Sequence, residues 1–74
     1  MIIGVPKEIK SNENRVSLLP VGAQTLKNHG HTVLVETRAA LGSGFDDGTY
    51  INAGAQIIST PQEIYSRANM IMKV

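Results

Sequence analysis

Four short apolar runs, separated by segments with helix start and stop signals, constrain the fold of this chain more than any other feature. The runs are residues 2–5, 32–36, 56–59 and 70–74. Their apolar residues are continuous rather than alternating, which is typical of strands buried on both faces of a parallel sheet. A helix between successive strands lets each strand run in the same direction as the last. The pattern therefore predicts an α/β fold of three layers, in which βαβ units build a mostly parallel sheet.

The first two connecting segments each carry the signals of a short helix. Pro20 suits a first helical position and Gly30 lies just past the expected end, so a helix of about three turns is predicted between them. Asp46 is a suitable N-cap for a second helix, which is predicted to end at Gly54. The side chains that we expect the first helix to place on the sheet are Leu19, Ala23 and Leu26.

The third connecting segment has the clearest local signal. Thr60-Pro61-Gln62-Glu63 is a capping box with proline at the first helical position. Ile64, Tyr65 and Ala68 are expected to form the apolar face of this helix, and Asn69 is expected to end it in a left-handed conformation.

The connection between the first strand and the first helix is longer than the turn requires. Residues 7–15 are mostly polar or charged, whereas strand-to-helix loops usually take roughly 2 to 6 residues. Arg15 is the candidate binding residue in this loop, because its guanidinium offers a planar fork of donors that matches a carboxylate or phosphate. The alternative is an exposed arginine paired with Glu8 or Glu13, an arrangement that contributes little to stability.

Composition indicates one small globular unit or a piece of one. The chain has 74 residues, 42% hydrophobic content, a formal charge of +1 and no cysteine, so no disulfide can stabilise it. Scattered basic residues and three aromatic residues argue against a nucleic-acid surface. There is no signal-peptide pattern and no apolar stretch near the roughly 20 residues that span a bilayer. A soluble cytoplasmic protein without a membrane partner is therefore expected.

Two further patterns resemble binding motifs but fail their tests. His29 and His31 lack third and fourth ligands nearby, so no metal site is predicted. Gly42-Ser43-Gly44 could begin a dinucleotide fingerprint, but Asp47 stands where the third glycine is needed and no strand directly precedes the motif. The glycines are interpreted as turn formers, so no cofactor site is predicted in this chain.

The positions with the most distinctive spacing together resemble a known family. They are similar, over essentially the whole chain, to the N-terminal motif shared by alanine dehydrogenase and the nicotinamide nucleotide transhydrogenase. The matching residues are Gly4-Val5-Pro6, Glu8, Asn12-Glu13, Arg15-Val16, Pro20, Gly22, Leu26, Gly30, Gly42-Ser43-Gly44-Phe45, Ala53-Gly54-Ala55 and Ile71-Met72-Lys73-Val74. The Gly42 to Phe45 loop looks more like the dehydrogenase branch.

A few positions depart from the family pattern. Leu19 stands where the family usually has Ser or Thr, which removes an N-cap oxygen, and Ser17 stands for a usual alanine. Arg38 and Ala40 stand where relatives commonly have glycine, and both are poor choices if that turn needs positive φ.

The resemblance implies a Rossmann/flavodoxin-like catalytic domain, of which residues 1–74 would be the truncated N-terminal part. The absence of any element after the last predicted strand, residues 70–74, leads to the same expectation. The implied enzyme is a homo-oligomeric, NAD-dependent alanine dehydrogenase that interconverts L-alanine and pyruvate. Its catalytic lysine would follow Val74 and its dinucleotide-binding domain would lie elsewhere, so no catalytic residue is expected in this chain. The family's carboxylate-binding arginine maps onto Arg15.

Two alternatives stay open. The chain could be the N-terminal part of the transhydrogenase alpha subunit, which binds the cofactor but no amino acid and works with a membrane partner. It could also be a stand-alone, non-enzymatic module that docks through an exposed sheet edge. The isolated 74-residue chain is expected to have no dehydrogenase activity.

Overall fold

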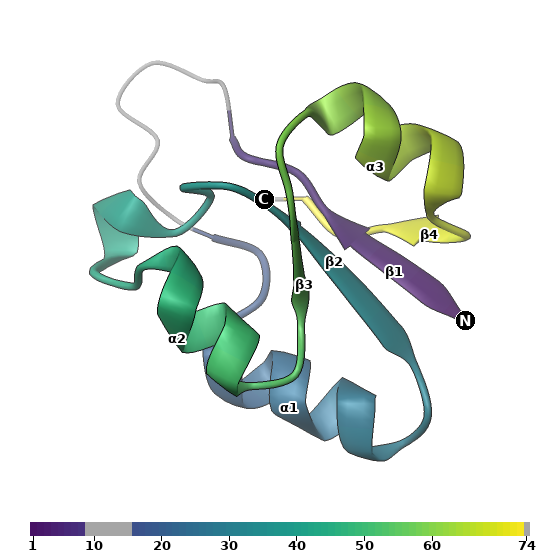
Figure 1. Ribbon diagram of the computed structural model, residues 1–74, viewed down its shortest axis with the longest axis horizontal. Helices are drawn as coiled ribbons and strands as arrows, with labels where there is room; N and C mark the ends of the chain where they lie inside the picture. Colours follow the sequence, from purple (N-terminus) through teal and green to yellow (C-terminus); the bar gives the residue numbers. More distant parts are fainter. Residues whose placement is uncertain (9–15, 74) are drawn as a thin grey trace.

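The computed structural model describes residues 1–8 and 16–73, and within these residues it contains a parallel four-stranded sheet (Figure 1). The strands are β1 (Ile2–Val5), β2 (Thr32–Glu36), β3 (Gln56–Ile58) and β4 (Met70–Ile71), in the order β3-β2-β1-β4. Every neighbouring pair is parallel. The predicted parallel sheet is confirmed, although β4 ends at Ile71 and is shorter than the predicted strand; Val74 lies outside the described residues.

In the described part of the chain, three α-helices cover the two faces of the sheet. Helices α1 (Pro20–Asn28) and α2 (Asp47–Asn52) lie on one face and contact each other, while α3 (Pro61–Arg67) lies on the other (Figure 1). The alternation of side chains along β2 explains the division, since successive residues of a strand point to opposite faces. Val33 and Val35 pack with α1 and α2, whereas Leu34 packs with Ile64 of α3. The predicted three-layer α/β architecture is therefore confirmed.

Just before helix α1, a different leucine from the one predicted reaches the core, while the predicted Leu26 within the helix packs against it. Leu19 is the N-cap residue, makes no side-chain capping bond and is 48% exposed, so its assignment to the apolar face was wrong. Leu18 is 9% exposed and takes its place in the core beside Ala23. The Tyr50 hydroxyl donates to the Leu18 carbonyl over 2.7 Å, and burial raises the pKa of this phenol above its ordinary value.

The loop before α2 contains a short 3-10 turn, Leu41–Ser43, that the sequence pattern did not indicate. Gly44 follows it with φ 90°, which supports the interpretation of these glycines as turn formers. Asp46 caps α2 as predicted, since its side chain accepts from the Thr49 backbone N–H over 2.9 Å. This bond and a second from the Thr49 hydroxyl hold the pKa of Asp46 below its ordinary value.

Helix α3 begins as predicted and ends differently. The Thr60 hydroxyl accepts from the Glu63 N–H over 3.3 Å. The end was predicted wrongly, because Asn69 is not left-handed: the backbone is already extended at Ala68. Instead the Asn69 N–H donates to the Ile2 carbonyl and its Oδ1 accepts from the Ile2 N–H, so Asn69 pairs with the start of β1.

Ile64 is the main contact of α3 with the sheet, and Gly4 of β1 makes this close approach possible. A Cβ atom at Gly4 would lie 2.6 Å from Ile64 Cγ2 and 2.9 Å from Ala68 Cβ. Tyr65, which was predicted to share the apolar face, is 52% exposed instead. Glycine at position 4 therefore sets the distance between α3 and the sheet.

Candidate functional site

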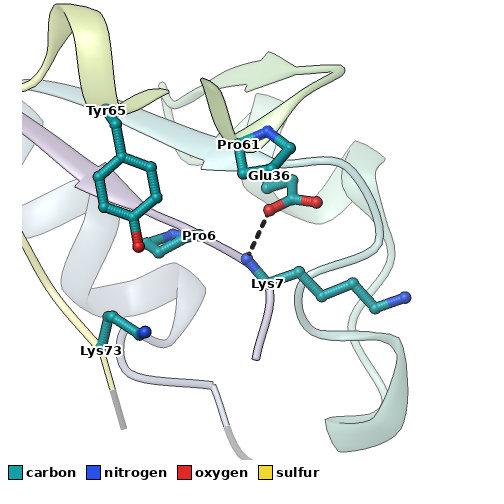
Figure 2. A pocket seen from close by; sticks show the side chains of 6 residues that line it. All are labelled: Pro6, Lys7, Glu36, Pro61, Tyr65 and Lys73. Carbon is teal, nitrogen blue, oxygen red and sulfur yellow. Dashed lines mark hydrogen bonds between the residues drawn. The ribbon is translucent and has the colours of Figure 1, made fainter. Parts of the chain in front are cut away.

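A cavity of about 210 Å³ lies at the carboxyl end of the sheet (Figure 2). In parallel α/β sheets this edge is where ligands usually bind, because the loops that follow the strands meet there. The lining residues come from the ends of β1, β2 and β4 and from α3. They are Pro6, Lys7, Glu36, Pro61, Tyr65 and Lys73.

A hydrogen bond between the ends of β1 and β2 forms part of the cavity wall. The Lys7 backbone N–H donates to Glu36 Oε1 over 2.9 Å, as the dashed line in Figure 2 shows. The last paired residues of the two strands are Val5 and Val35, so the Lys7 amide lies beyond the ladder and takes a side-chain acceptor instead. The chain therefore leaves β1 in a direction held by Glu36.

The two described flanks of residues 9–15 lie at this same edge of the sheet. Lys7 lines the cavity on one side. On the other, the Ser17 hydroxyl donates to the Met72 carbonyl over 2.8 Å, and Met72 precedes the cavity residue Lys73. The Met72 N–H in turn donates to the Gly4 carbonyl over 2.9 Å, which holds this segment beside β1. The candidate residue Arg15 itself lies outside the described residues, as does its alternative partner Glu13.

The described wall of the cavity combines apolar and charged groups. Pro6, Pro61 and the Tyr65 side chain, which extends from α3 in Figure 2, supply the apolar part. The charged residues Lys7, Glu36 and Lys73 also line the cavity, and the Lys7 side chain runs away from Tyr65 and Lys73 in Figure 2. One carboxylate oxygen of Glu36 accepts a hydrogen bond from the Lys7 amide.

Glu36, Tyr65 and Lys73 line the cavity but were not predicted as site residues from the sequence. One signal was present for Glu36 and Lys73. Glu36 is the last residue of the predicted strand 32–36 and Lys73 lies one residue before the end of the predicted strand 70–74, and the carboxyl ends of parallel strands share one edge. Tyr65 had no such signal, because its place in a helical apolar pattern favoured the core.

The two patterns that failed their motif tests have structural roles here. The His29 ring nitrogen Nδ1 lies 2.8 Å from the Thr25 carbonyl oxygen of its own helix. Asp47 accepts from the Thr37 hydroxyl and, over 2.8 Å, from the Arg38 N–H, so it ties the start of α2 to the residues that follow β2. Within residues 1–8 and 16–73, no group of three or more acidic, histidine or cysteine side chains is placed to hold a metal ion. No helix in the same ranges is long and apolar enough to cross a membrane.

Sequence comparison shows that the chain is similar to the N-terminal part of alanine dehydrogenases. The family model described as alanine dehydrogenase/PNT, N-terminal domain, matches residues 4–74. The chain is 60% identical over 74 residues to an alanine dehydrogenase of Bacillus subtilis (strain 168) and 50% identical to one of Methanococcus maripaludis. These alignments cover 100% of this chain but 19% and 20% of the relatives, so the chain spans about a fifth of their length.

Solved structures agree in fold. An L-alanine dehydrogenase matches 99% of the chain with a TM-score of 0.95 and 49% identity, and the match covers 20% of that protein. A transhydrogenase from Sinorhizobium meliloti matches 99% of the chain with a TM-score of 0.89 and 34% identity, again over 20% of its own chain. The matched sequence, the shared sheet and the helices on both faces together show that this chain belongs to the alanine dehydrogenase/PNT N-terminal domain family.

Proposed function

We propose that residues 1–74 are the N-terminal part of the substrate domain of an NAD-dependent alanine dehydrogenase. The reaction is the conversion of L-alanine, NAD and water to pyruvate, ammonia and NADH. The observation that carries the proposal is the 60% identity, without a break in coverage, to the Bacillus subtilis alanine dehydrogenase. The cavity at the carboxyl end of the sheet supports it, because this edge is where an α/β enzyme holds a small substrate.

In this proposal Arg15 binds the substrate carboxylate. The anchored positions of Lys7 and Ser17 support this role, since both flanks of the segment that carries Arg15 are held at the cavity edge. A guanidinium can donate two parallel hydrogen bonds to a carboxylate, which fixes the orientation of the ligand as well as its position. Arg15 would thereby hold the α-carbon in place for the reaction.

The cofactor and the catalytic residues are proposed to lie outside this chain. The Gly42 to Gly44 loop is not proposed as a dinucleotide site, because Leu41–Ser43 form a 3-10 turn and Asp47, which accepts from Thr37 and Arg38, stands where a fingerprint needs its third glycine. NAD would be bound by a separate dinucleotide-binding domain of the full-length enzyme. That enzyme is further proposed to be a cytoplasmic homo-oligomer.

Replacement of Arg15 by lysine in the full-length enzyme tests the proposed role. A lysine keeps the charge but loses the bidentate geometry, so the KM for L-alanine is expected to rise roughly 10- to 100-fold, which corresponds to one lost charge-assisted bond. The KM for NAD is expected to stay unchanged. Steady-state kinetics with L-alanine and NAD varied in turn provide the measurement.

Arg67→Lys is a matched control for this experiment. Arg67 lies on α3, where its guanidinium bonds the Glu63 carboxylate at 3.1 Å on the surface. Its replacement is expected to leave both Michaelis constants unchanged. An Arg15→Lys enzyme with an unaltered KM for L-alanine would rule out the assignment of Arg15.

The second candidate function is that of a transhydrogenase alpha subunit, because the Sinorhizobium meliloti transhydrogenase shares the fold at a TM-score of 0.89. The identity of 34%, against 49% for the L-alanine dehydrogenase, favours the dehydrogenase. Failure of the full-length wild-type protein to form NADH from L-alanine and NAD would favour the transhydrogenase or a non-enzymatic docking module instead.

A further inference from the structure

Tyr65 is an aromatic side chain that α3 places at the cavity rather than in the core. It is 52% exposed, and it lines the cavity together with Pro61. The two residues are four apart in α3, so their side chains are neighbours on one face of the helix. Figure 2 shows the Tyr65 ring reaching from α3 toward Pro6. The helix therefore supplies an aromatic wall to the cavity.

The opposite wall continues the surface of the sheet on which α3 packs. Gly4 lies against Ile64 of that helix, and Ile71 packs on the same cluster. Pro6 and Lys73 follow Gly4 and Ile71 by two residues, and alternate residues of an extended chain point to the same side. Both line the cavity. The cavity is therefore the space that remains where the interface between α3 and the sheet ends.

The helix that carries the aromatic wall is held in place by packing. Ile64, the residue before Tyr65, is fully buried, and a Cβ atom at Gly4 would lie 2.6 Å from its Cγ2. A contact this close leaves the helix no room to approach the sheet, and a retreat of the helix would expose Ile64. The separation between the aromatic wall and the sheet is therefore fixed by the docking of α3.

The size of the cavity limits the ligand that this wall can face. Its volume of about 210 Å³ equals that of roughly seven water molecules, at about 30 Å³ each in the liquid. A three-carbon amino acid has about as many non-hydrogen atoms, so it fits this space. Pro6, Pro61 and the Tyr65 ring supply the apolar lining, so the apolar side chain of such a ligand is expected to lie against them.

We propose that Tyr65 is a specificity-determining residue, whose ring closes the cavity beside the side chain of the substrate and thereby limits the length of that side chain. This inference rests on the proposed function. The ring acts by direct contact, since a methyl group fits beside it, whereas a longer aliphatic side chain would overlap it.

Three variants of the full-length enzyme separate the ring from the hydroxyl and from a general effect on α3. Tyr65→Ala removes the wall, and Tyr65→Phe keeps the ring but removes the hydroxyl. Gln62→Ala is the matched control, because Gln62 is an exposed residue of α3 that does not line the cavity. If Tyr65→Ala fails to fold, Tyr65→Leu takes its place, since leucine also shortens the wall.

Steady-state kinetics with L-alanine and L-norvaline measure the selection, because L-norvaline is longer by two methylene groups. Tyr65→Ala is expected to raise the ratio of kcat/KM for L-norvaline to kcat/KM for L-alanine at least about 10-fold, since one methylene group in an apolar pocket changes this constant by roughly 10-fold or more. Tyr65→Phe and Gln62→Ala are expected to keep the ratio within about 3-fold of the wild type. The KM for NAD is expected to stay unchanged in all three variants.

Calorimetric titration gives a second readout that does not depend on turnover. The enzyme, with NADH bound and ammonia absent, is titrated with pyruvate and with the keto acid of L-norvaline. In Tyr65→Ala the ratio of the two Kd values is expected to shift in favour of the longer keto acid by at least about 10-fold. Tyr65→Phe is expected to keep the wild-type ratio.

The role of Tyr65 and the proposed function fail on different results. A wild-type enzyme without alanine-dependent NADH formation would overturn the proposed function and the role of Tyr65 with it. An active wild type whose Tyr65→Ala variant keeps the wild-type preference for L-alanine would overturn the role of Tyr65 alone. The same conclusion would follow if Tyr65→Phe or Gln62→Ala changed the preference as much as Tyr65→Ala does.

Discussion

Arg38 adopts a left-handed backbone conformation, with φ 64°, that a residue with a Cβ atom occupies at a cost of roughly 1 to 2 kcal/mol. Its N–H donates to Asp47, and this bond holds the residue in the turn between β2 and α2. Ala40 stands two residues later with φ −116°, a conformation open to any residue. The expectation that both positions suit glycine is therefore supported at position 38 only.

Replacement of Arg38 by glycine should stabilise the chain by up to about 1 kcal/mol. The strain at positive φ is relieved, and part of the gain is offset because glycine loses more conformational freedom on folding. The free energy of unfolding, measured by urea denaturation, provides the test.

Ala40→Gly is the matched control for that substitution. It has no positive φ to relieve and removes a buried methyl group, so it should destabilise by roughly 0.5 to 1 kcal/mol. If Arg38→Gly destabilised the chain as much as Ala40→Gly does, backbone strain at Arg38 would not be the controlling effect.

At the scale of elements, the packing of α3 on β1 depends on a residue without a side chain. Gly4 faces Ile64, Ala68 and Ile71, and a Cβ atom at position 4 would lie closer to the first two than real Cβ contacts allow. Because Ile64 is fully buried and Gly4 lies in a paired strand, neither side can move away freely.

Gly4→Ala should therefore destabilise the chain by about 1 to 3 kcal/mol, the usual cost of overpacking. Gly48→Ala in α2 is the control, since a Cβ atom there has its nearest neighbour, Asp46 Oδ1, at 3.4 Å and alanine favours a helix. Urea denaturation should show a loss for the first variant and none for the second. Equal stability of both variants would contradict the close approach of α3 to the sheet.

At the scale of the whole molecule, the described part of the chain has a cavity at the carboxyl end of its sheet that is built from segments far apart in the sequence. Glu36 ends β2, while Lys7 and Lys73 follow β1 and β4, and the three residues line one cavity because those strands are parallel and adjacent. The chain spans about a fifth of its relatives, so a full active site is proposed to need the remaining parts of the enzyme.

The isolated 74-residue chain is accordingly expected to form no NADH from L-alanine and NAD, whereas the full-length enzyme does. A spectrophotometric assay of both purified proteins at equal molar concentration provides the comparison. Activity that stays with the isolated chain through purification would contradict the proposal that the catalytic residues and the NAD site lie outside this chain.

The sequence by itself determined the types and approximate bounds of the strands and helices, because these depend on local signals. Continuous apolar runs marked the strands, and Asp46 and the Thr60 capping box began their helices where predicted. The family motif likewise depends on residue identities in order. The same local information identified Arg15 as a candidate, and its assignment stays a prediction.

Only the tertiary structure decided which of these residues meet. Leu18 rather than Leu19 reaches the core because the approach of α1 to the sheet is set by long-range packing. Asn69 pairs with Ile2, 67 residues earlier, so a local cap preference was overridden by a strand partner. The strand order β3-β2-β1-β4 brings Lys7 to Glu36 and Ser17 to Met72. Contacts between residues so far apart in the chain could not be predicted from the sequence, because they produce no local periodicity or spacing.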